Sequence, residues 1–188
     1  MVQAPNKKIT LANFLALPET KPASEFVNGQ ILQKSMPQGQ HSTLQGELVT
    51  QINAVTKPKK LAWAFPELRC TFGGKSLVPD VAVFTWARIP TTETGNIANQ
   101  FNKAPDWTVE ILSPGQSSTR VTSNILHCIE NGTLLGWLID PAEEIILVYQ
   151  PNQPPLSLET GQQKLVVPAF ASELTLTIES VFSWLQII

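Results

Sequence analysis

The stretch "PDWTVEILSPGQSST", Pro105 to Thr119, joins a buried strand to the start of a helix. Trp107 to Leu112 is a short apolar run rich in aromatic and β-branched residues, which is typical of a strand. The polar segment after it predicts a helix over 118–131, closed by Gly132 as its C-terminal cap. One carboxylate, Glu110, lies near the end of this apolar strand, where an ionised group is costly unless it has a partner.

A second acidic residue lies in a similar place upstream. The segment "LVPDVAVF", 77–84, reads as a strand with Asp80 at its start. Because side chains alternate along a strand, Asp80 shares a face with Ala82 and Phe84. By the same rule, Glu110 shares a face with Thr108 and Leu112. If the two strands pair, both carboxylates can point into one space.

The rest of the chain predicts a mixture of helices and strands. The pair Asn28-Gly29 indicates a hairpin turn. Helices are expected at 10–17, 40–56 and 177–185, and strands at 25–33 (a hairpin), 61–65, 67–72, 79–84, 135–140 and 144–150, with a further strand pair before the last helix. The polar, turn-rich segment 85–104 is expected to be a long mobile loop. This irregular alternation predicts a mixed α/β (α+β) fold, a central mixed sheet flanked by helices, in one domain covering 1–188.

Composition narrows the functional classes. The chain has 188 residues and a net charge of −2, so no global positive field draws it to nucleic acid. The two cysteines, Cys70 and Cys128, are far apart and lack a metal-binding spacing, so two buried free thiols are expected. Neither a signal-peptide core nor an apolar run long enough for a membrane span is found, which predicts a soluble, cytoplasmic protein without membrane partners.

Two adjacent carboxylates repel each other unless a cation lies between them. An all-oxygen pair suits Mg²⁺ or Mn²⁺ better than zinc, and a metal held by few protein ligands keeps waters, one of which can act as a nucleophile. There is a simpler alternative, in which Asp80 is an ordinary strand-start residue and Glu110 forms a salt bridge to Arg69 or Lys75.

The helix predicted after Glu110 carries a polar stripe, Arg120, Asn124, His127 and Asn131, at helical spacing. A cation on its first turn could reach a phosphate. Arg120 lies near the helix N-terminus, where a positive charge is mildly unfavourable, which hints at an anionic neighbour. The alternative is that the stripe is simply solvated, and this is the interpretation favoured for His127.

Several of these motifs together resemble the Uma-two family of restriction-endonuclease-like proteins, within the PD-(D/E)xK nuclease superfamily. The resemblance rests on Pro79-Asp80, the run "EILSP" at 110–114, Gly132 and "WLIDP" at 137–141. It extends from the hairpin "EFVNG" to the closing helix. The short PD and ExL pieces alone would be weak signals.

The resemblance implies a divalent metal at the sheet edge, held by Asp80, Glu110 and the carbonyl of Ile111. It also implies that Glu47, on the early helix, is the extra acidic residue of many superfamily members. The lysine expected two residues after Glu110 is replaced by Leu112, and the lysine that many relatives carry on the next helix is replaced by Asn124. Arg120 could replace that charge as a phosphate clamp, although not as a general base, because arginine stays protonated.

The first hypothesis is therefore a Mg²⁺-dependent endonuclease that hydrolyses phosphodiester bonds, with DNA as its expected substrate. Here Asp80, Glu110, Glu47 and Arg120 form the catalytic set. Lys75 and Lys103 either assist phosphate binding or, more simply, are solvated surface lysines. The second is a catalytically decayed nuclease scaffold that binds nucleic acid or protein without cleavage. The third is a structural protein that oligomerises through its tryptophans. A homodimer is expected, because nucleases that cut both strands often pair two sites about a two-fold axis.

Overall fold

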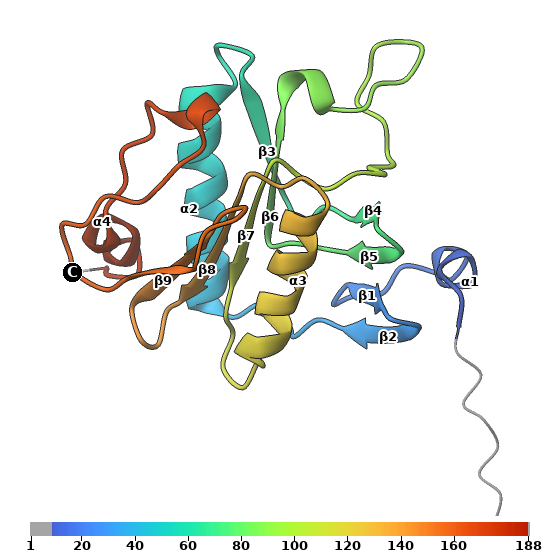
Figure 1. Cartoon of the computed structure of the whole chain (residues 1–188), viewed down its shortest axis with the longest axis horizontal. Helices are drawn as coiled ribbons and strands as arrows, with labels where there is room; N and C mark the ends of the chain where they lie inside the picture. Colours follow the sequence, from blue (N-terminus) through green and yellow to red (C-terminus); the bar gives the residue numbers. More distant parts are fainter. Residues whose placement is uncertain (1–8, 188) are drawn as a thin grey trace, which may run out of the picture.

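The structure is a computed structural model that describes residues 9–187. It contains one six-stranded sheet and one four-stranded sheet, with helices on the larger sheet (Figure 1). The large sheet has the order β10-β9-β8-β7-β6-β3, in which only β7 and β8 are parallel neighbours. Its strands are β3 (Ala62–Pro66), β6 (Val81–Thr85), β7 (Trp107–Ile111), β8 (Leu135–Asp140), β9 (Ile145–Tyr149) and β10 (Leu156–Leu158).

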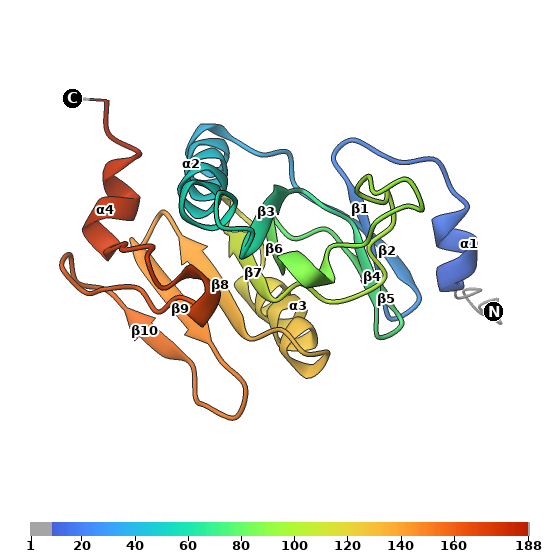
Figure 2. The same ribbon diagram turned by 90° about the horizontal axis from the view of Figure 1, so that it is seen from above.

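Two long helices cover opposite faces of this sheet. Figure 2 shows α2 (Gly39–Thr56) on one side of the strands and α3 (Ser118–Glu130) on the other. The side of α2 that faces the sheet buries Leu44, Leu48 and Ile52 completely, as their helical spacing predicts. The predicted mixed sheet flanked by helices is confirmed. Residues 1–8 and 188, which the predicted single domain includes, lie outside the described residues.

The smaller sheet, of order β2-β1-β5-β4, lies beside the large one (Figure 1). It contains β1 (Ser24–Val27), β2 (Gln30–Gln33), β4 (Cys70–Phe72) and β5 (Lys75–Leu77), with α1 (Leu11–Leu15) at its margin. Asn28 and Gly29 form the predicted turn between β1 and β2, with φ values of 52° and 81°. This hairpin delivers two side chains, one from β1 and one just after β2, to the candidate site described below.

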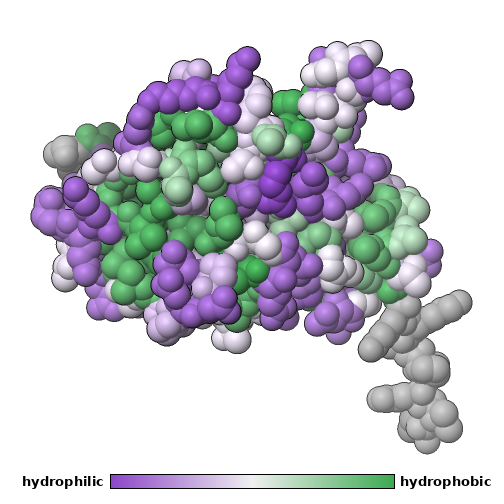
Figure 3. Space-filling view, turned by 45° about the horizontal axis from the view of Figure 1, so that its top comes forward, coloured by the Kyte–Doolittle hydropathy of each residue, from purple (hydrophilic) through white to green (hydrophobic). Residues whose placement is uncertain are grey.

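The C-terminal part of the chain closes one end of the large sheet. It contains η2 (Ala169–Ala171) and α4 (Ile178–Ser183), a shorter helix than the predicted 177–185. The expected final strand pair is wrong in part: β10 pairs with β9, and the segment after it contributes only an isolated bridge between Lys164 and Thr177. Hydrophobic side chains gather over this C-terminal region on the left of Figure 3.

The loop predicted over 85–104 is partly anchored. It starts with the 3-10 turn η1 (Trp86–Arg88), whose Arg88 pairs with Asp106, and it ends with Phe101 buried against β4. The middle projects from the molecule (Figure 1). Both cysteines are buried and free, as expected. Within residues 9–187, no helix has the length and apolar character needed to cross a membrane.

The alternative that the polar stripe on α3 is simply solvated, which was favoured for His127, is wrong for two of its residues. Asn124 and His127 are buried, because the small sheet covers this side of the helix. The His127 ring stacks on Phe72 at a centroid distance of 5.2 Å, and its Nε2 lies 3.3 Å from the Phe72 carbonyl oxygen. His127 is thus a packed structural residue, and burial lowers its pKa.

Candidate active site

The two carboxylates predicted from strand parity lie next to each other. β6 and β7 pair antiparallel with Val81 opposite Val109, so the next position along the register sets Asp80 opposite Glu110. Both side chains are buried, with 2% and 4% exposure. The Ile111 N–H donates to Asp80 Oδ2 at 2.8 Å, which fixes one carboxylate oxygen against the end of β7. The structure therefore brings Asp80, Glu110 and Ile111 together.

A lysine that the sequence analysis did not single out lies between these carboxylates. Lys34 follows β2, and its Nζ donates to Asp80 Oδ1 at 2.5 Å and to the Val78 carbonyl at 2.7 Å. The same nitrogen lies 3.8 Å from Glu110 Oε2. Neither alternative partner considered for Glu110 pairs with it in the described residues, since Arg69 pairs with Glu19 and Lys75 forms no ion pair there.

A third carboxylate, Glu25 of β1, completes a buried acidic group around Lys34. Its Oε1 accepts from the Val78 N–H at 2.8 Å, and its Oε2 accepts from Asn124 Nδ2 at 3.1 Å. Asn124, at the position where the resemblance implies a lysine, thus serves as a hydrogen-bond donor to a carboxylate. We call Glu25, Lys34, Asp80 and Glu110 the acidic cluster.

On the other side of Asp80, helix α2 contributes a histidine. His41 Nε2 lies 3.3 Å from Asp80 Oδ1, and its Nδ1 lies 3.1 Å from Ser113 Oγ. All three side chains are buried. One turn further along α2, Gln45 Nε2 donates to the Asp80 carbonyl at 2.8 Å. These contacts hold both the side chain and the backbone of Asp80 in place.

Burial and mutual repulsion set the charges in the acidic cluster. Burial raises the pKa of Glu110 well above its usual value; Asp80 and Glu25 add to the rise, and Lys34 opposes it. Burial also raises the pKa of Glu25. For Asp80 the burial effect is outweighed by Lys34 and His41, so its pKa falls to about 2. Lys34 has a raised pKa despite its burial, because three carboxylates surround it.

The acidic cluster contains more carboxyl groups than positive charges. One ammonium faces three buried carboxylates, and burial, with repulsion between the carboxylates, raises the pKa of Glu25 and of Glu110. A divalent cation would supply the missing charge, and carboxylate oxygens are the ligands that Mg²⁺ and Mn²⁺ prefer. Among residues 9–187, no group of three or more His, Cys, Asp or Glu side chains is close enough together to hold a metal ion. An ion held by Asp80 and Glu110 would thus have no third His, Cys, Asp or Glu ligand among these residues.

The two remaining predicted residues lie further out. Arg120 is exposed on the first turn of α3 and lines, with Glu25, Lys34, Glu110 and Asn124, a cavity of about 300 Å³. Its guanidinium makes no ion pair with the described residues, so it is free to meet a ligand at the rim. Glu47 is half-buried on α2, and no hydrogen bond or ion pair within 9–187 joins it to the acidic cluster.

Sequence reasoning missed Glu25, Lys34 and His41. Glu25 and Lys34 belong to the hairpin that packs beside the large sheet, and His41 lies on the side of α2 that faces the sheet, one turn before Leu44. His41 carried a usable signal, because a polar residue in the buried stripe of a helix needs a partner. Lys34 carried no such signal in the sequence, since its position after β2 resembles that of any surface lysine.

Comparison with known proteins places these features in context. The model of the family Uma2, described as "Putative restriction endonuclease", matches residues 11–179. A solved structure described as "a putative nuclease belonging to DUF820" from Anabaena variabilis ATCC 29413 is 58% identical in sequence, with a TM-score of 0.94. The match covers 95% of this chain and 99% of that one. No curated protein matched the sequence.

Proposed function

The chain belongs to the Uma2 family of restriction-endonuclease-like proteins, and from this premise we propose that it is a metal-dependent endonuclease that hydrolyses phosphodiester bonds in DNA. The observation that carries the proposal is the acidic cluster, in which Asp80 and Glu110 lie side by side against the ammonium of Lys34. The name given to the Anabaena variabilis protein, a nuclease, agrees with this proposal.

In this proposal Asp80 and Glu110 hold Mg²⁺ or Mn²⁺, and the carbonyl of Ile111 is a further ligand. When bound, such an ion polarises a phosphoryl oxygen and lowers the pKa of a coordinated water. The protein supplies a buried site in which both carboxylates are already placed. The contacts of Asp80 with His41, Gln45 and the Ile111 N–H keep it in one orientation.

In this proposal Lys34 supplies the positive charge near the phosphate that was expected of Arg120. Its raised pKa keeps it protonated at neutral pH, so it acts as a fixed positive charge and not as a proton acceptor. An ammonium at this place can stabilise the negative charge that develops on a phosphate during hydrolysis. Arg120, exposed at the rim of the same cavity, would bind a neighbouring phosphate.

A second candidate function is a decayed nuclease scaffold that binds nucleic acid without cleavage. The contact that favours it is the short Lys34–Asp80 pair, since Lys34 already neutralises a carboxylate that a metal would need. The two candidates differ in one respect, because only the first requires that a divalent cation enter the acidic cluster.

A cleavage assay tests the proposal. Purified protein is incubated with supercoiled plasmid and with single-stranded DNA, in Mg²⁺, in Mn²⁺ and in EDTA. We expect cleavage with either metal, none in EDTA, and none by Asp80→Asn or Glu110→Gln. Glu93→Gln, which changes an exposed loop carboxylate, is the matched control and stays active. Cleavage by Asp80→Asn at the wild-type rate would overturn the proposal.

A homodimer accompanies this proposal. Two copies of one site, related by a two-fold axis, would cut both strands of a duplex. Light scattering coupled to size-exclusion chromatography measures the mass in solution. We expect twice the 20.6 kDa of one chain, and a value equal to one chain contradicts the dimer.

A further inference from the structure

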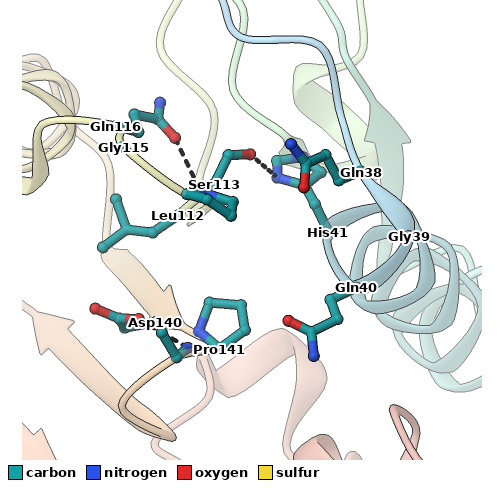
Figure 4. Close-up of a pocket in the computed structure, with 12 residues that line it drawn as sticks. Gln38, Gly39, Gln40, His41, Leu112, Ser113, Gly115, Gln116, Asp140 and Pro141 are labelled. Atoms are coloured by element: carbon teal, nitrogen blue, oxygen red, sulfur yellow. Dashed lines mark hydrogen bonds between the residues drawn. The ribbon is translucent and has the colours of Figure 1, made fainter.

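A second cavity lies beside the acidic cluster, on the other side of the loop after β7. Its volume is about 490 Å³, within the range of small-molecule sites. Three segments enclose it: the start of α2, the β7–α3 loop and the end of β8 (Figure 4). His41 contacts both regions, since its Nε2 lies next to Asp80 and its Nδ1 next to Ser113, which lines this cavity.

The lining of this second cavity is suited to a neutral, polar and flat group. Three carboxamide side chains line it, those of Gln38, Gln40 and Gln116. Its apolar walls include the rings of Pro114 and Pro141. No lysine or arginine is among the residues that line it, and Asp140 contributes a carboxylate, so the cavity disfavours a phosphate. Carboxamides donate and accept hydrogen bonds at once, which matches the edge of a nucleobase.

The two cavities are neighbours. Gly115 and Gln116 line both the second cavity and the cavity that contains Glu110, Lys34 and Arg120. A nucleotide whose phosphate lies near Lys34 and Arg120 can therefore place an adjacent base across this loop segment. A base can do so only when it is unpaired, because a stacked and paired base cannot leave the duplex without being extruded.

The net charge of the protein also favours recognition of an unpaired base. Proteins that bind duplex DNA through its backbone make many phosphate contacts with lysine and arginine. Here the net charge is −2, and among the residues lining the two cavities only Lys34 and Arg120 are lysine or arginine. With only these two cations at the cavities, contacts with a base would supply part of the affinity, by hydrogen bonding to its edge and packing against its face.

We propose that the glutamine-lined cavity binds an unpaired nucleobase next to the scissile phosphate. The substrate class is thus DNA with an unpaired nucleotide, in a single strand, a bulge or a flipped-out position. This inference rests on the proposed nuclease function and specifies its substrate. The base-binding residues are Gln38 and Gln40, with Gln116 oriented by its hydrogen bond from the Ser113 N–H at 3.1 Å.

Fluorescence anisotropy with three labelled probes tests this, using the Glu110→Gln protein so that no probe is cut. The probes are a fully paired 20-mer duplex, the same duplex with one bulged thymidine, and the bulged duplex with an abasic nucleotide in place of that thymidine. We expect the bulged probe to bind at least about fivefold more tightly than the other two. The double variant Gln38→Ala/Gln40→Ala is expected to abolish that preference.

The double variant should still fold, because neither side chain makes a hydrogen bond in the described structure and both residues are exposed. Gln153→Ala, which changes an exposed glutamine in a distant turn, is the matched control and keeps the preference. Equal binding of the three probes, no binding of any probe, or an unchanged preference in the double variant overturns the inference. The proposed function fails separately, if wild-type protein with Mg²⁺ or Mn²⁺ cuts none of the three probes and no plasmid.

Discussion

Lys34 Nζ lies 2.5 Å from Asp80 Oδ1, so the residue that follows β2 of the small sheet directly neutralises the carboxylate that precedes β6 of the large sheet. The two residues are 46 positions apart in the chain, and both are largely buried. The pair joins the two sheets at the point where Glu110 and Glu25 also meet. The charge balance of this Lys34–Asp80 pair determines what the acidic cluster can bind.

Replacing Lys34 should destabilise the protein strongly. Lys34→Met leaves the carboxylates of Asp80 and Glu110 buried without their cation, which costs about 3 kcal/mol in the free energy of unfolding at pH 7. Urea denaturation measures this, with Lys164→Met, at an exposed site, as the control. We also expect Mg²⁺ to stabilise Lys34→Met more than wild type. A loss below about 1 kcal/mol would show that Lys34 does not hold the cluster together.

The pH dependence of stability should reveal Asp80. Its pKa is lowered to about 2 in the folded protein, so it stabilises the fold above its unfolded pKa. That contribution, about 2 kcal/mol, is lost as the pH falls from about 4 toward 2. Urea unfolding at several pH values should therefore show a smaller acid loss in Asp80→Asn than in wild type. Parallel profiles for the two proteins would contradict the assigned shift.

Gly136 permits the close packing of α3 on β8. A Cβ at this position would collide with Ile125 Cγ2 from the helix, so Gly136→Ala must displace the Ile125 side chain or α3 itself. We expect a loss of about 2 kcal/mol in the free energy of unfolding. Gly46→Ala is the control, since a Cβ there meets open space on α2 and should stabilise the helix slightly. Equal stability of the two variants would refute the packing account.

Arg120 should affect DNA binding and not stability. It is exposed at the rim of the cavity, so Arg120→Gln is expected to change the free energy of unfolding by less than about 0.5 kcal/mol. If it contacts one phosphate, the slope of log K against log salt should fall by about one. Anisotropy titrations at several salt concentrations measure the slope. An unchanged slope means that Arg120 makes no phosphate contact.

Local patterns in the sequence were sufficient to predict the large sheet and its acidic pair. Alternation along the two strands predicts that Asp80 and Glu110 point into one space if the strands pair, and the register of β6 and β7 meets that condition. The family motifs lie in these same strands and in β8, which explains why the resemblance identified the fold. The turn at Asn28-Gly29 could also be predicted from the sequence, because it requires positive φ angles, which this residue pair favours.

The cation of the site could not be predicted in this way. Lys34 reaches Asp80 only because the β1–β2 hairpin packs beside the large sheet, and a contact over 46 residues leaves no periodic signal. The same packing buries Asn124 and His127, which a single helix would expose to solvent. Arg120 was selected because it is close in sequence to Glu110, whereas the structure favours a lysine that is close in space.

Isothermal titration calorimetry with MgCl₂ and MnCl₂ tests the central claim most directly, because it requires no substrate. We expect wild type to bind one equivalent of metal and Glu110→Gln to bind at least about tenfold more weakly, since one of two carboxylate ligands is lost. Glu93→Gln should match wild type. If wild type binds neither ion, or if Glu110→Gln binds as tightly as wild type, the acidic cluster is a salt-bridged structural feature and not a metal site.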